Sequence, residues 1–540
     1  MDTFKKHKEV LVILALSVVI VLSSGLTSEL YLGDEVCHYR FAKDIFQAGK
    51  RVAFDPIYPT GNPPGYFYSS EPFWSSFLAI VWRLTGNISF PLAQIYHTIY
   101  YVLLILVTYL LGIEIYGKKE GVYAALLISS IPMVVSFSIL FYLDVPGTAF
   151  AALSLLLLLK RRYFLTGLAI CLMYFTRRNA CFLVPGYILV VLFIDRERLH
   201  LKLKNIASLI LPTGILGFMD IRWRTNHIEN VKYKIAGMGE FSSIDAWDYI
   251  KSRVTKILFG SGEYLNSSLM KPEDITRYLG LALLISLVLY LFFRRPKGKD
   301  LMLWVCIVVY LLLFAFLFGI SSDIRYILPI IPLFCLLASS VLGSVEHLKW
   351  SKFLIWTLCL VQLLAVSFYV HQRRIMPAGM REGFLFIKEN TPKDALFMYP
   401  GYIFIEGTGR KFVWGSFFQV ESWLMKKQYP ELDFTNDKRA FMFWKENEED
   451  IKRMMEFNRL DYIVVDKSRI YDDTEVKHFG GYPKSFIQRL PRMSFITEVF
   501  ENKEMVVWKV NLERKEGPFP WLKKGNDRLG EYPGARNGRS

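Results

Sequence analysis

An acidic pair follows the first apolar segment of the chain, and its side chains are of a type that can catalyse a transfer reaction. Asp34 and Glu35 are adjacent, and His38 lies four residues after Asp34, on the same helical face. Adjacent helical positions diverge by about 100°, so one acid can face a cavity while the other packs. The functional interpretation is a general base that deprotonates an acceptor hydroxyl. A solvated acidic helix start is the alternative.

Further charged side chains stand at the ends of later apolar segments. Asp144 lies in FYLDVPG, Arg177 and Arg178 lie in TRRNA, and Arg325 lies in SSDIRY. Guanidinium groups at this depth are suited to bidentate contact with a phosphate. Asp144 can equally be an ordinary turn residue, and each arginine can snorkel to lipid headgroups. Basic residues are expected to be scarce at the outer ends of membrane-spanning segments, however, so these arginines favour an anion site.

Known nucleotide and metal motifs are missing from the sequence. Neither G-x-x-x-x-G-K-[ST] nor a strand-linked G-x-G-x-x-G occurs, and no HExxH or CxxC pattern is present. A transfer reaction on the outer side therefore needs a donor other than a cytosolic nucleotide, and a lipid-linked donor fits.

The elements that must position these residues are apolar helices. The chain has 540 residues, of which 53% are hydrophobic and 21% are charged, with 65 basic and 49 acidic residues. Basic residues in short clumps between apolar runs indicate a membrane protein and exclude a nucleic-acid partner. Eleven segments are predicted to span the bilayer: 9–26, 89–114, 120–140, 146–160, 163–176, 180–194, 205–219, 276–293, 300–320, 326–344 and 352–370.

Lys and Arg give the orientation, because they are retained on the cytoplasmic side. With the N-terminus inside, six short cytoplasmic segments hold 18 basic residues, and residues 371–540 lie outside. The sequence therefore predicts a multi-pass protein in a prokaryotic plasma membrane or an endoplasmic reticulum membrane.

Three domains are expected. Residues 1–370 form the membrane domain, whose first external loop, 27–88, carries amphipathic helices; SSGLTSELYLGDE is expected to continue the first helix outward. Residues 371–511 form an outer α/β domain, with a buried strand in LDYIVVDK and a hairpin in SFITEVFENKEMVVWKV. Residues 512–540 form a disordered basic tail.

The same residues carry a family likeness. GDEVCHYRFAKDIFQAGK followed by NPPGYFYSSEPFW resembles the first external loop of GT-C superfamily glycosyltransferases, near the protein mannosyltransferase and aminoarabinose transferase group (glycosyltransferase families 39 and 83). FYLDVPGTAFAALSLLLLL resembles their second motif, and SSDIRYILPIIPLF resembles their Arg-Tyr-x-x-Pro motif. The likeness covers roughly residues 1–345.

The resemblance implies inverting transfer from a dolichyl- or undecaprenyl-phosphate-linked sugar to a protein, lipid or glycan acceptor. It implies that Asp34 or Glu35 is the base, that Asp144 shapes the site and that Arg325 binds the donor phosphate. The topology adds Arg177 and Arg178 to the phosphate contacts. Possible substrate contacts are His38, Tyr39, Asp323 and Tyr326.

Metal dependence stays open at this point. Some GT-C enzymes hold a divalent cation on acids of the first two external loops, and others need none. Here Asp34 and Asp144 are the residues for Mg²⁺ or Mn²⁺. A transporter or flippase of a polyprenyl-linked lipid, a scaffold with an outer binding domain, and a lipid-linked glycan ligase are the competing interpretations.

Overall fold

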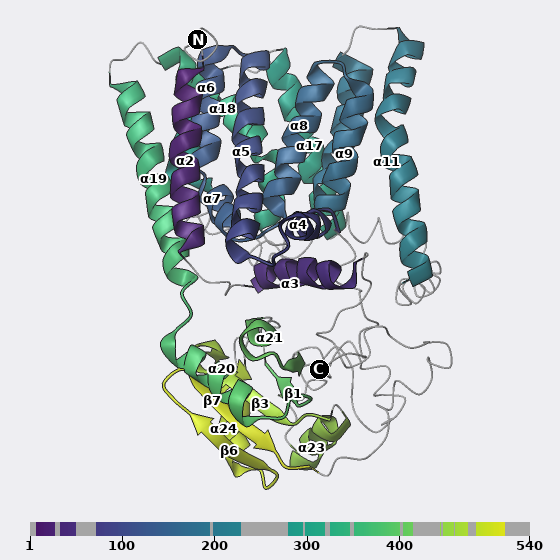
Figure 1. Cartoon of the computed structure of the whole chain (residues 1–540). Coiled ribbons are helices and arrows are strands. Elements are labelled where there is room, and N and C mark those ends of the chain that lie inside the picture. The colour runs from purple at the N-terminus through teal and green to yellow at the C-terminus, as the bar shows by residue number, and fades with distance from the viewer. Residues whose placement is uncertain are drawn as a thin grey trace.

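The described part of the chain forms a helical bundle and a smaller region of strands. The computed structural model describes residues 7–27, 33–49, 72–194, 198–227, 279–294, 298–318, 324–345, 350–399, 403–413, 443, 447–457, 459–472 and 482–512. The bundle helices run side by side, and the strands lie beyond one end of the bundle (Figure 1). Two helices, α3 (Gly33–Ala48) and α4 (Pro72–Thr85), lie across this end, which we call the α3 end.

A helix, or a run of short helices, coincides with each apolar segment of the sequence. They are α2 (Lys8–Leu26), α5 (Phe90–Ile115), α6 (Lys118–Ser130) with α7 (Pro132–Ile139), α8 (Asp144–Leu159), α9 (Tyr163–Thr176), the run η1 (Arg178–Phe182), α10 (Leu183–Leu189) and η2 (Val190–Ile194), α11 (Leu199–His227), α16 (Leu281–Phe293), α17 (Lys299–Phe318), η3 (Ile324–Ile330) with α18 (Ile331–Val345), and α19 (Ser351–Arg373).

Fewer helices meet the length and composition expected of a membrane span than the sequence has apolar segments. Among the described residues, five helices are long and apolar enough to cross a membrane, or six if α6 and α7 form one span. These two helices are bent by 59°, because Pro132 holds Ile131 in an extended conformation and removes a backbone donor. The figure of eleven crossings stays a prediction.

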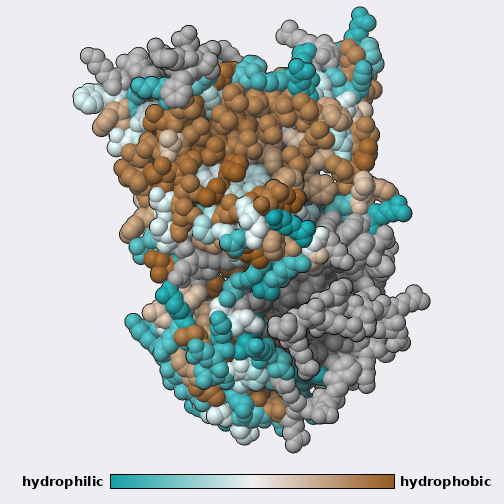
Figure 2. Space-filling view, in the orientation of Figure 1, coloured by the Kyte–Doolittle hydropathy of each residue, from teal (hydrophilic) through white to brown (hydrophobic). Residues whose placement is uncertain are grey.

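The outer surface of the bundle is apolar. A broad hydrophobic band crosses the visible face of the bundle. Hydrophilic residues gather at the ends of the bundle and on the strand region (Figure 2). Leu291 is 67% exposed and Phe292 is 81% exposed, whereas Tyr101 and Leu104 in α5 are fully buried. An apolar surface of this extent is unfavourable in water and matches lipid acyl chains. The chain is therefore built as a multi-pass membrane protein.

The first helix ends earlier than expected. We expected SSGLTSELYLGDE to extend it outward, but α2 ends at Leu26, and α3 lies across the bundle instead of continuing it (Figure 1). The reason is that α3 has two apolar faces. Tyr39 and Ala42 pack into the core of the bundle, while Phe41 packs into a core on the strand side. The expected amphipathic helix in FWSSFLAIVWRL is confirmed as α4.

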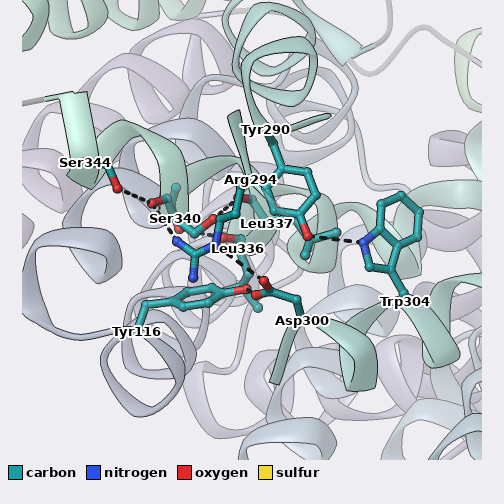
Figure 3. A network of polar contacts seen from close by, with 10 residues as sticks. Tyr116, Tyr290, Arg294, Asp300, Trp304, Leu336, Leu337, Ser340 and Ser344 are labelled. Carbon is teal, nitrogen blue, oxygen red and sulfur yellow. Dashed lines mark hydrogen bonds and ion pairs between the residues drawn. The ribbon is translucent and has the colours of Figure 1, made fainter. Parts of the chain in front are cut away.

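Polar contacts tie the helices together at the end opposite to α3 (Figure 3). The buried Asp300 carboxylate accepts hydrogen bonds from the Tyr116 hydroxyl and from Nε of Arg294, the latter at 3.4 Å. Nη1 of Arg294 also donates to the backbone oxygen of Ser340 at 3.0 Å. This network joins the α5, α16, α17 and α18 ends away from the candidate site.

The region after α19 contains a five-stranded sheet of order β2-β1-β3-β7-β6. Its elements are α20 (Ala378–Asn390), β1 (Leu396–Met398), α21 (Ile403–Thr408), β2 (Lys411–Val413), α23 (Glu448–Phe457), β3 (Tyr462–Asp466), β4 (Ile470–Tyr471), β5 (Tyr482–Pro483), α24 (Lys484–Arg489), β6 (Ile496–Glu501) and β7 (Met505–Val510). β1 is parallel to β2 and β3, and β7 is antiparallel to β3 and β6. The buried strand and the hairpin predicted from the sequence are both present. The expected tail lies outside the described residues, apart from residue 512.

The strand region shares a hydrophobic core with α3. One cluster contains Val36, Phe41 and Ile45 of α3 together with Phe384 and Phe404 of the strand region. Ion pairs from Arg40 and Lys43 of α3 to Glu406 of α21 reinforce this contact. The strand region is therefore packed directly on the helix that carries the acidic pair.

Candidate active site

Asp144 and Arg177 form a buried ion pair at the α3 end. Asp144 is the first residue of α8, where a carboxylate is favoured by the partial positive charge of the helix N-terminus. Nε of Arg177 donates to Oδ1 of Asp144 at 2.9 Å, and the two side chains are 13% and 2% exposed. Arg177 caps the C-terminus of α9 in an extended conformation, which directs it toward α8. The sequence identified both residues separately but not their pairing.

A glycine makes this pairing possible. A Cβ atom added to Gly147 in α8 would lie 2.5 Å from Cβ of Arg177, closer than real Cβ contacts come. The first turn of α8 can therefore approach the end of α9 only without a side chain at position 147.

Two guanidinium groups flank the ring of Tyr326. Cζ of Arg177 lies 5.1 Å from the ring centroid, and Cζ of Arg325 lies 5.4 Å from it. Arg325 also lies 5.7 Å from the ring of Tyr142, in the turn between α7 and α8. Cation–π contacts of this kind hold a guanidinium in place without neutralising its charge. Two guanidinium groups around one ring are suited to contact with an anion.

The sequence analysis missed Asn179, which holds η3 against this group. Nδ2 of Asn179 donates to the backbone oxygen of Tyr326 and to the hydroxyl of Tyr310, each at 3.3 Å. The Tyr310 hydroxyl donates to the same backbone oxygen of Tyr326. Asn179 belongs to the TRRNA segment. Its position directly after two arginines was the only feature of the sequence that could have indicated it.

Arg178 lies in a different cluster from its neighbour Arg177. Its Nη2 is 3.6 Å from Oδ2 of Asp220 in α11, and its Cζ lies 5.3 Å from the ring of Tyr174. The Tyr174 hydroxyl donates to the same Asp220 oxygen at 3.4 Å. The structure thus separates the two arginines that the sequence treated together. Arg178 is 37% exposed.

Glu35 is fully buried and paired with an arginine that the sequence analysis did not select. Oε2 of Glu35 lies 2.7 Å from Nη2 of Arg374, and both side chains are 0% exposed. Arg374 follows the last bundle helix, α19, in the segment HQRR. The argument that singled out the other arginines applies equally to HQRR, and would have found it. Glu35 is therefore the acid that packs.

The other candidates on α3 contribute mainly to packing. Tyr39 is 8% exposed, and burial together with the nearby Glu406 carboxylate raises its pKa to about 12. His38 is half-buried, with its ring 6.4 Å from that of Trp74. Position 34 lies in α3, but the Asp34 side chain lies outside the described residues, as does Asp323.

The turn between α7 and α8 connects the two ion pairs. Phe141 lies 5.4 Å from Cζ of Arg374, and its ring stacks on that of Tyr39 at 6.2 Å. The next residue, Tyr142, contacts Arg325 on the other side. One short turn therefore lies between the Glu35–Arg374 pair and the arginines around Tyr326.

Potential metal ligands are scattered among the residues that the structure describes. No group of three or more His, Cys, Asp or Glu side chains among them could hold a metal ion. Asp144, one of the two expected ligands, already carries the Arg177 guanidinium at 2.9 Å. A cation at Asp144 would have to displace that charge, so this residue fits a metal poorly.

The architecture and the site define a class before any comparison is made. The molecule is a bundle of apolar helices with two helices lying across one end, beside an α/β region (Figure 1). The ion pairs Asp144–Arg177 and Glu35–Arg374 lie at this end. This is the arrangement of a multi-pass membrane protein with a polar site at one end of its bundle.

Known proteins share this fold. A family model described as dolichyl-phosphate-mannose-protein mannosyltransferase matches residues 69–221. The structure resembles the oligosaccharyltransferase of Archaeoglobus fulgidus, at 14% identity and TM-score 0.57, over 86% of this chain and 70% of that one. It also resembles ArnT from Cupriavidus metallidurans bound to undecaprenyl phosphate, at 14% identity and TM-score 0.53, over 95% and 99%. No curated protein matches by sequence.

A third match is the arabinofuranosyltransferase AftD from Mycobacteria, at 13% identity and TM-score 0.52, over 95% of this chain and 40% of that one. All three are glycosyltransferases of the GT-C type. The chain therefore shares the fold of these three proteins, and the GT-C fold predicted from its sequence motifs is confirmed.

Proposed function

We propose that the protein is an inverting glycosyltransferase that uses a polyprenyl-phosphate-linked sugar as donor. The observation that carries this proposal is the placement of two guanidinium groups, those of Arg177 and Arg325, around the ring of Tyr326 at the same end of the bundle as α3. The phosphate leaving group develops negative charge as the bond to the sugar breaks, and a fixed guanidinium stabilises that charge.

The reaction needs a base as well as a cation. The acceptor hydroxyl or amide attacks C1 of the sugar from the face opposite the phosphate, the C1–O bond breaks, and polyprenyl phosphate leaves with the bonding electrons. The acceptor proton passes to a carboxylate. We assign this carboxylate to Asp34, because Glu35 and Asp144 are each held by an arginine.

Asp144 then has a supporting role. Its hydrogen bond to Nε orients Arg177 beside Tyr326, and Arg325, which contacts the same ring, supplies the phosphate contact. Since guanidinium groups provide the positive charge and Asp144 is paired, we propose transfer without a divalent cation. Retention of full activity in EDTA tests this directly, and loss of activity that Mg²⁺ or Mn²⁺ restores would contradict it.

The printed names of the similar structures support a lipid phosphate donor. The ArnT structure contains undecaprenyl phosphate, and one structure of the Archaeoglobus oligosaccharyltransferase contains a dolichol-phosphate and an inhibitory peptide. The matched family model makes mannose the first sugar to test. We leave the acceptor as a protein, lipid or glycan.

We also propose the orientation that the basic loops predict. In this orientation the eleven segments cross the membrane, the N-terminus is cytoplasmic, and the active site and the α/β region lie outside. A cysteine placed at the exposed Lys484 in α24 should react with a membrane-impermeant maleimide in intact cells. A cysteine at the exposed Lys204 in α11 should react only after permeabilisation, and the reverse pattern would invert the topology.

The central experiment incubates the purified protein with radiolabelled dolichyl- and undecaprenyl-phosphate sugars in a membrane extract that supplies acceptors. Transfer of label to an acceptor with release of polyprenyl phosphate is expected. Asp34→Asn should slow the transfer of sugar by about 10²–10⁴-fold, because that is the usual contribution of a general base. The melting temperature of this variant should stay unchanged. Full activity of Asp34→Asn would remove the assignment of the base.

The competing functions are distinct outcomes of the same experiment. Movement of the lipid across a vesicle membrane without transfer of sugar would identify a flippase. Consumption of a pyrophosphate-linked oligosaccharide in preference to any single sugar would identify a glycan ligase. Either result would replace the proposed function.

A further inference from the structure

Arg374 joins four elements at the α3 end of the bundle. Nε of Arg374 donates to Oε2 of Glu35 at 3.0 Å and to Oε1 at 3.3 Å, and Nη2 forms an ion-pair contact with Oε2 at 2.7 Å. Nη1 donates to the Gly25 backbone oxygen in the last turn of α2 at 3.4 Å and to Oε1 of Gln94 in α5 at 3.3 Å. Arg374 itself ends α19 and begins the connection to the α/β region.

The surroundings of the guanidinium are fitted to it. Cζ lies 5.2 Å from the ring of Phe90 and 5.4 Å from that of Phe141, so the planar cation is held by aromatic faces as well as by hydrogen bonds. A Cβ on Gly25 would lie 2.5 Å from Cδ of Gln94. The last turn of α2 therefore approaches this group closely because residue 25 has no side chain.

Burial of the Glu35–Arg374 ion pair costs hydration free energy, so the pair is expected to have a role other than stability. Two charges removed from water lose hydration free energy that their attraction only partly returns, and an apolar pair of similar volume is often as stable. The Glu35–Arg374 pair is fully buried and adjacent to the residue that we assign as the base. A hydrogen-bonded ion pair fixes the orientation of a helix more tightly than an apolar contact, because its geometry is directional.

We propose that Arg374 is a positioning residue that sets the rotation of α3, and with it the Asp34 position, through Glu35. This inference rests on the proposed function for its catalytic consequence. It also extends the active-site architecture to the junction between the bundle and the α/β region. Nε2 of Gln94 donates to the backbone oxygen of Ser138 at 3.2 Å. The same arginine is thus connected to α7, directly before the turn that carries Phe141 and Tyr142.

The test separates positioning from stability. Arg374→Met leaves Glu35 buried without its cation, so this variant should lose both stability and transfer. The double variant Arg374→Met with Glu35→Leu makes the site apolar and should recover the melting temperature. If the pair positions α3, the double variant still transfers sugar about 10²-fold more slowly, through kcat, with the donor KM unchanged. Recovery of both melting temperature and kcat would overturn the proposal.

A matched control uses the neighbouring residue. Arg373 is exposed, and its guanidinium lies over Tyr369 at 5.1 Å. Arg373→Met removes the same charge one residue away and should leave kcat and the melting temperature unchanged. A loss of kcat in this variant equal to that of Arg374→Met would show a general charge effect and would overturn the assignment of Arg374.

Hydrogen exchange tests the positioning without any enzymatic assay. Amides of α3 (33–48) should exchange faster in the double variant than in the wild type, while amides of α5 keep their protection. Unchanged exchange in α3 would overturn the proposal even if the enzyme is active. Absence of transfer by the wild type on every donor would instead overturn the proposed function, and the exchange result would still decide whether Arg374 holds α3.

Discussion

Neighbouring residues in this chain have different partners because their side chains leave the backbone in different directions. Arg177 turns toward Asp144, whereas Arg178 turns toward Asp220 in α11. Glu35 packs against Arg374 inside the bundle, although it stands beside Asp34 in the sequence. Two adjacent charged residues can therefore have separate roles, and each residue has to be tested by its own substitution.

Arg325 should be tested through the donor. Arg325→Ala removes the guanidinium between Tyr142 and Tyr326 and should weaken use of the donor by about 10²-fold in kcat/KM, since a charged hydrogen bond to a phosphate contributes about 1.5–3 kcal/mol. Steady-state kinetics with varied polyprenyl-phosphate sugar measures this effect. Arg222→Ala, at an exposed position of α11, is the control and should change nothing. Unchanged donor dependence in Arg325→Ala would argue against a phosphate contact.

Gly147 is the second residue to test, because it admits Arg177. In Gly147→Ala the new Cβ would lie 2.5 Å from Cβ of Arg177, so the pair with Asp144 must shift. We expect a loss of about 1–3 kcal/mol in stability and a clear fall in transfer rate. Gly214→Ala in α11 is the matched control, since nothing lies within 4 Å of the added Cβ. It should be neutral or stabilising by up to about 1 kcal/mol in thermal unfolding.

At the scale of elements, α3 is held by charges on the side that faces the α/β region. Glu406 of α21 bonds to Nη1 of Arg40 at 3.1 Å and to Nζ of Lys43 at 3.2 Å. Asp44 lies beside them, 3.3 Å from Nε of Arg40. Burial raises the pKa of Asp44 to about 6, against the opposing effect of Arg40. The contact between α3 and α21 therefore contains a carboxyl group that titrates near neutral pH.

The pH dependence of this contact has a definite sign. The folded pKa of about 6 exceeds the ordinary aspartate pKa of 3.8, so the folded state binds the proton more tightly. The contribution of Asp44 to stability therefore falls as pH rises from about 4 to 6, and the cost is complete above pH 6. Asp44→Asn should stabilise the protein at pH 7.5 by about 1–2 kcal/mol, after discounting for partial exposure.

Thermal unfolding of the wild type and Asp44→Asn between pH 4 and pH 8 measures this difference. The gain should be present at pH 7.5 and should disappear at pH 4. Glu389→Gln, an exposed acid in α20, serves as control and should show no such pH-dependent gain. A gain for Asp44→Asn that stays constant across the range would contradict the raised pKa.

At the scale of the whole molecule, the α/β region is part of the support of the site. The core formed by Val36, Phe41 and Ile45 of α3 with Phe404 of α21 is separate from a second core of the α/β region, which contains Phe486 of α24. A change in the first core can reach α3, whereas the second core has no residue of α3 among those described.

A pair of core substitutions tests this difference. Phe404→Ala and Phe486→Ala each remove a fully buried ring, at an expected cost of about 3–5 kcal/mol. Only Phe404→Ala should also slow sugar transfer, by about 10-fold or more at temperatures where both variants are folded, because it loosens α3. Melting temperatures and kcat are measured on the same preparations. Equal transfer rates in the two variants would indicate that the shared core does not support the site.

The sequence by itself determined the helices of the bundle and the class of fold. An apolar segment in a membrane must satisfy its own backbone hydrogen bonds, so a helix is the local solution, and a helix coincides with every predicted segment. The strand in LDYIVVDK and the hairpin after it also follow from local alternation. The motifs around Asp34, Asp144 and Arg325 were sufficient to predict the GT-C fold, because they depend on order along the chain.

Only the tertiary structure decided which charges meet. Glu35 and Arg374 are 339 residues apart in the chain, and Asp144 and Arg177 are 33 residues apart. Periodicity reports the neighbours of a residue within a few turns, whereas these pairs depend on how helices pack and on glycines that admit close approach. The crosswise position of α3 has the same cause: its two apolar faces are visible in the sequence, but the two cores that they enter exist only once the chain is folded.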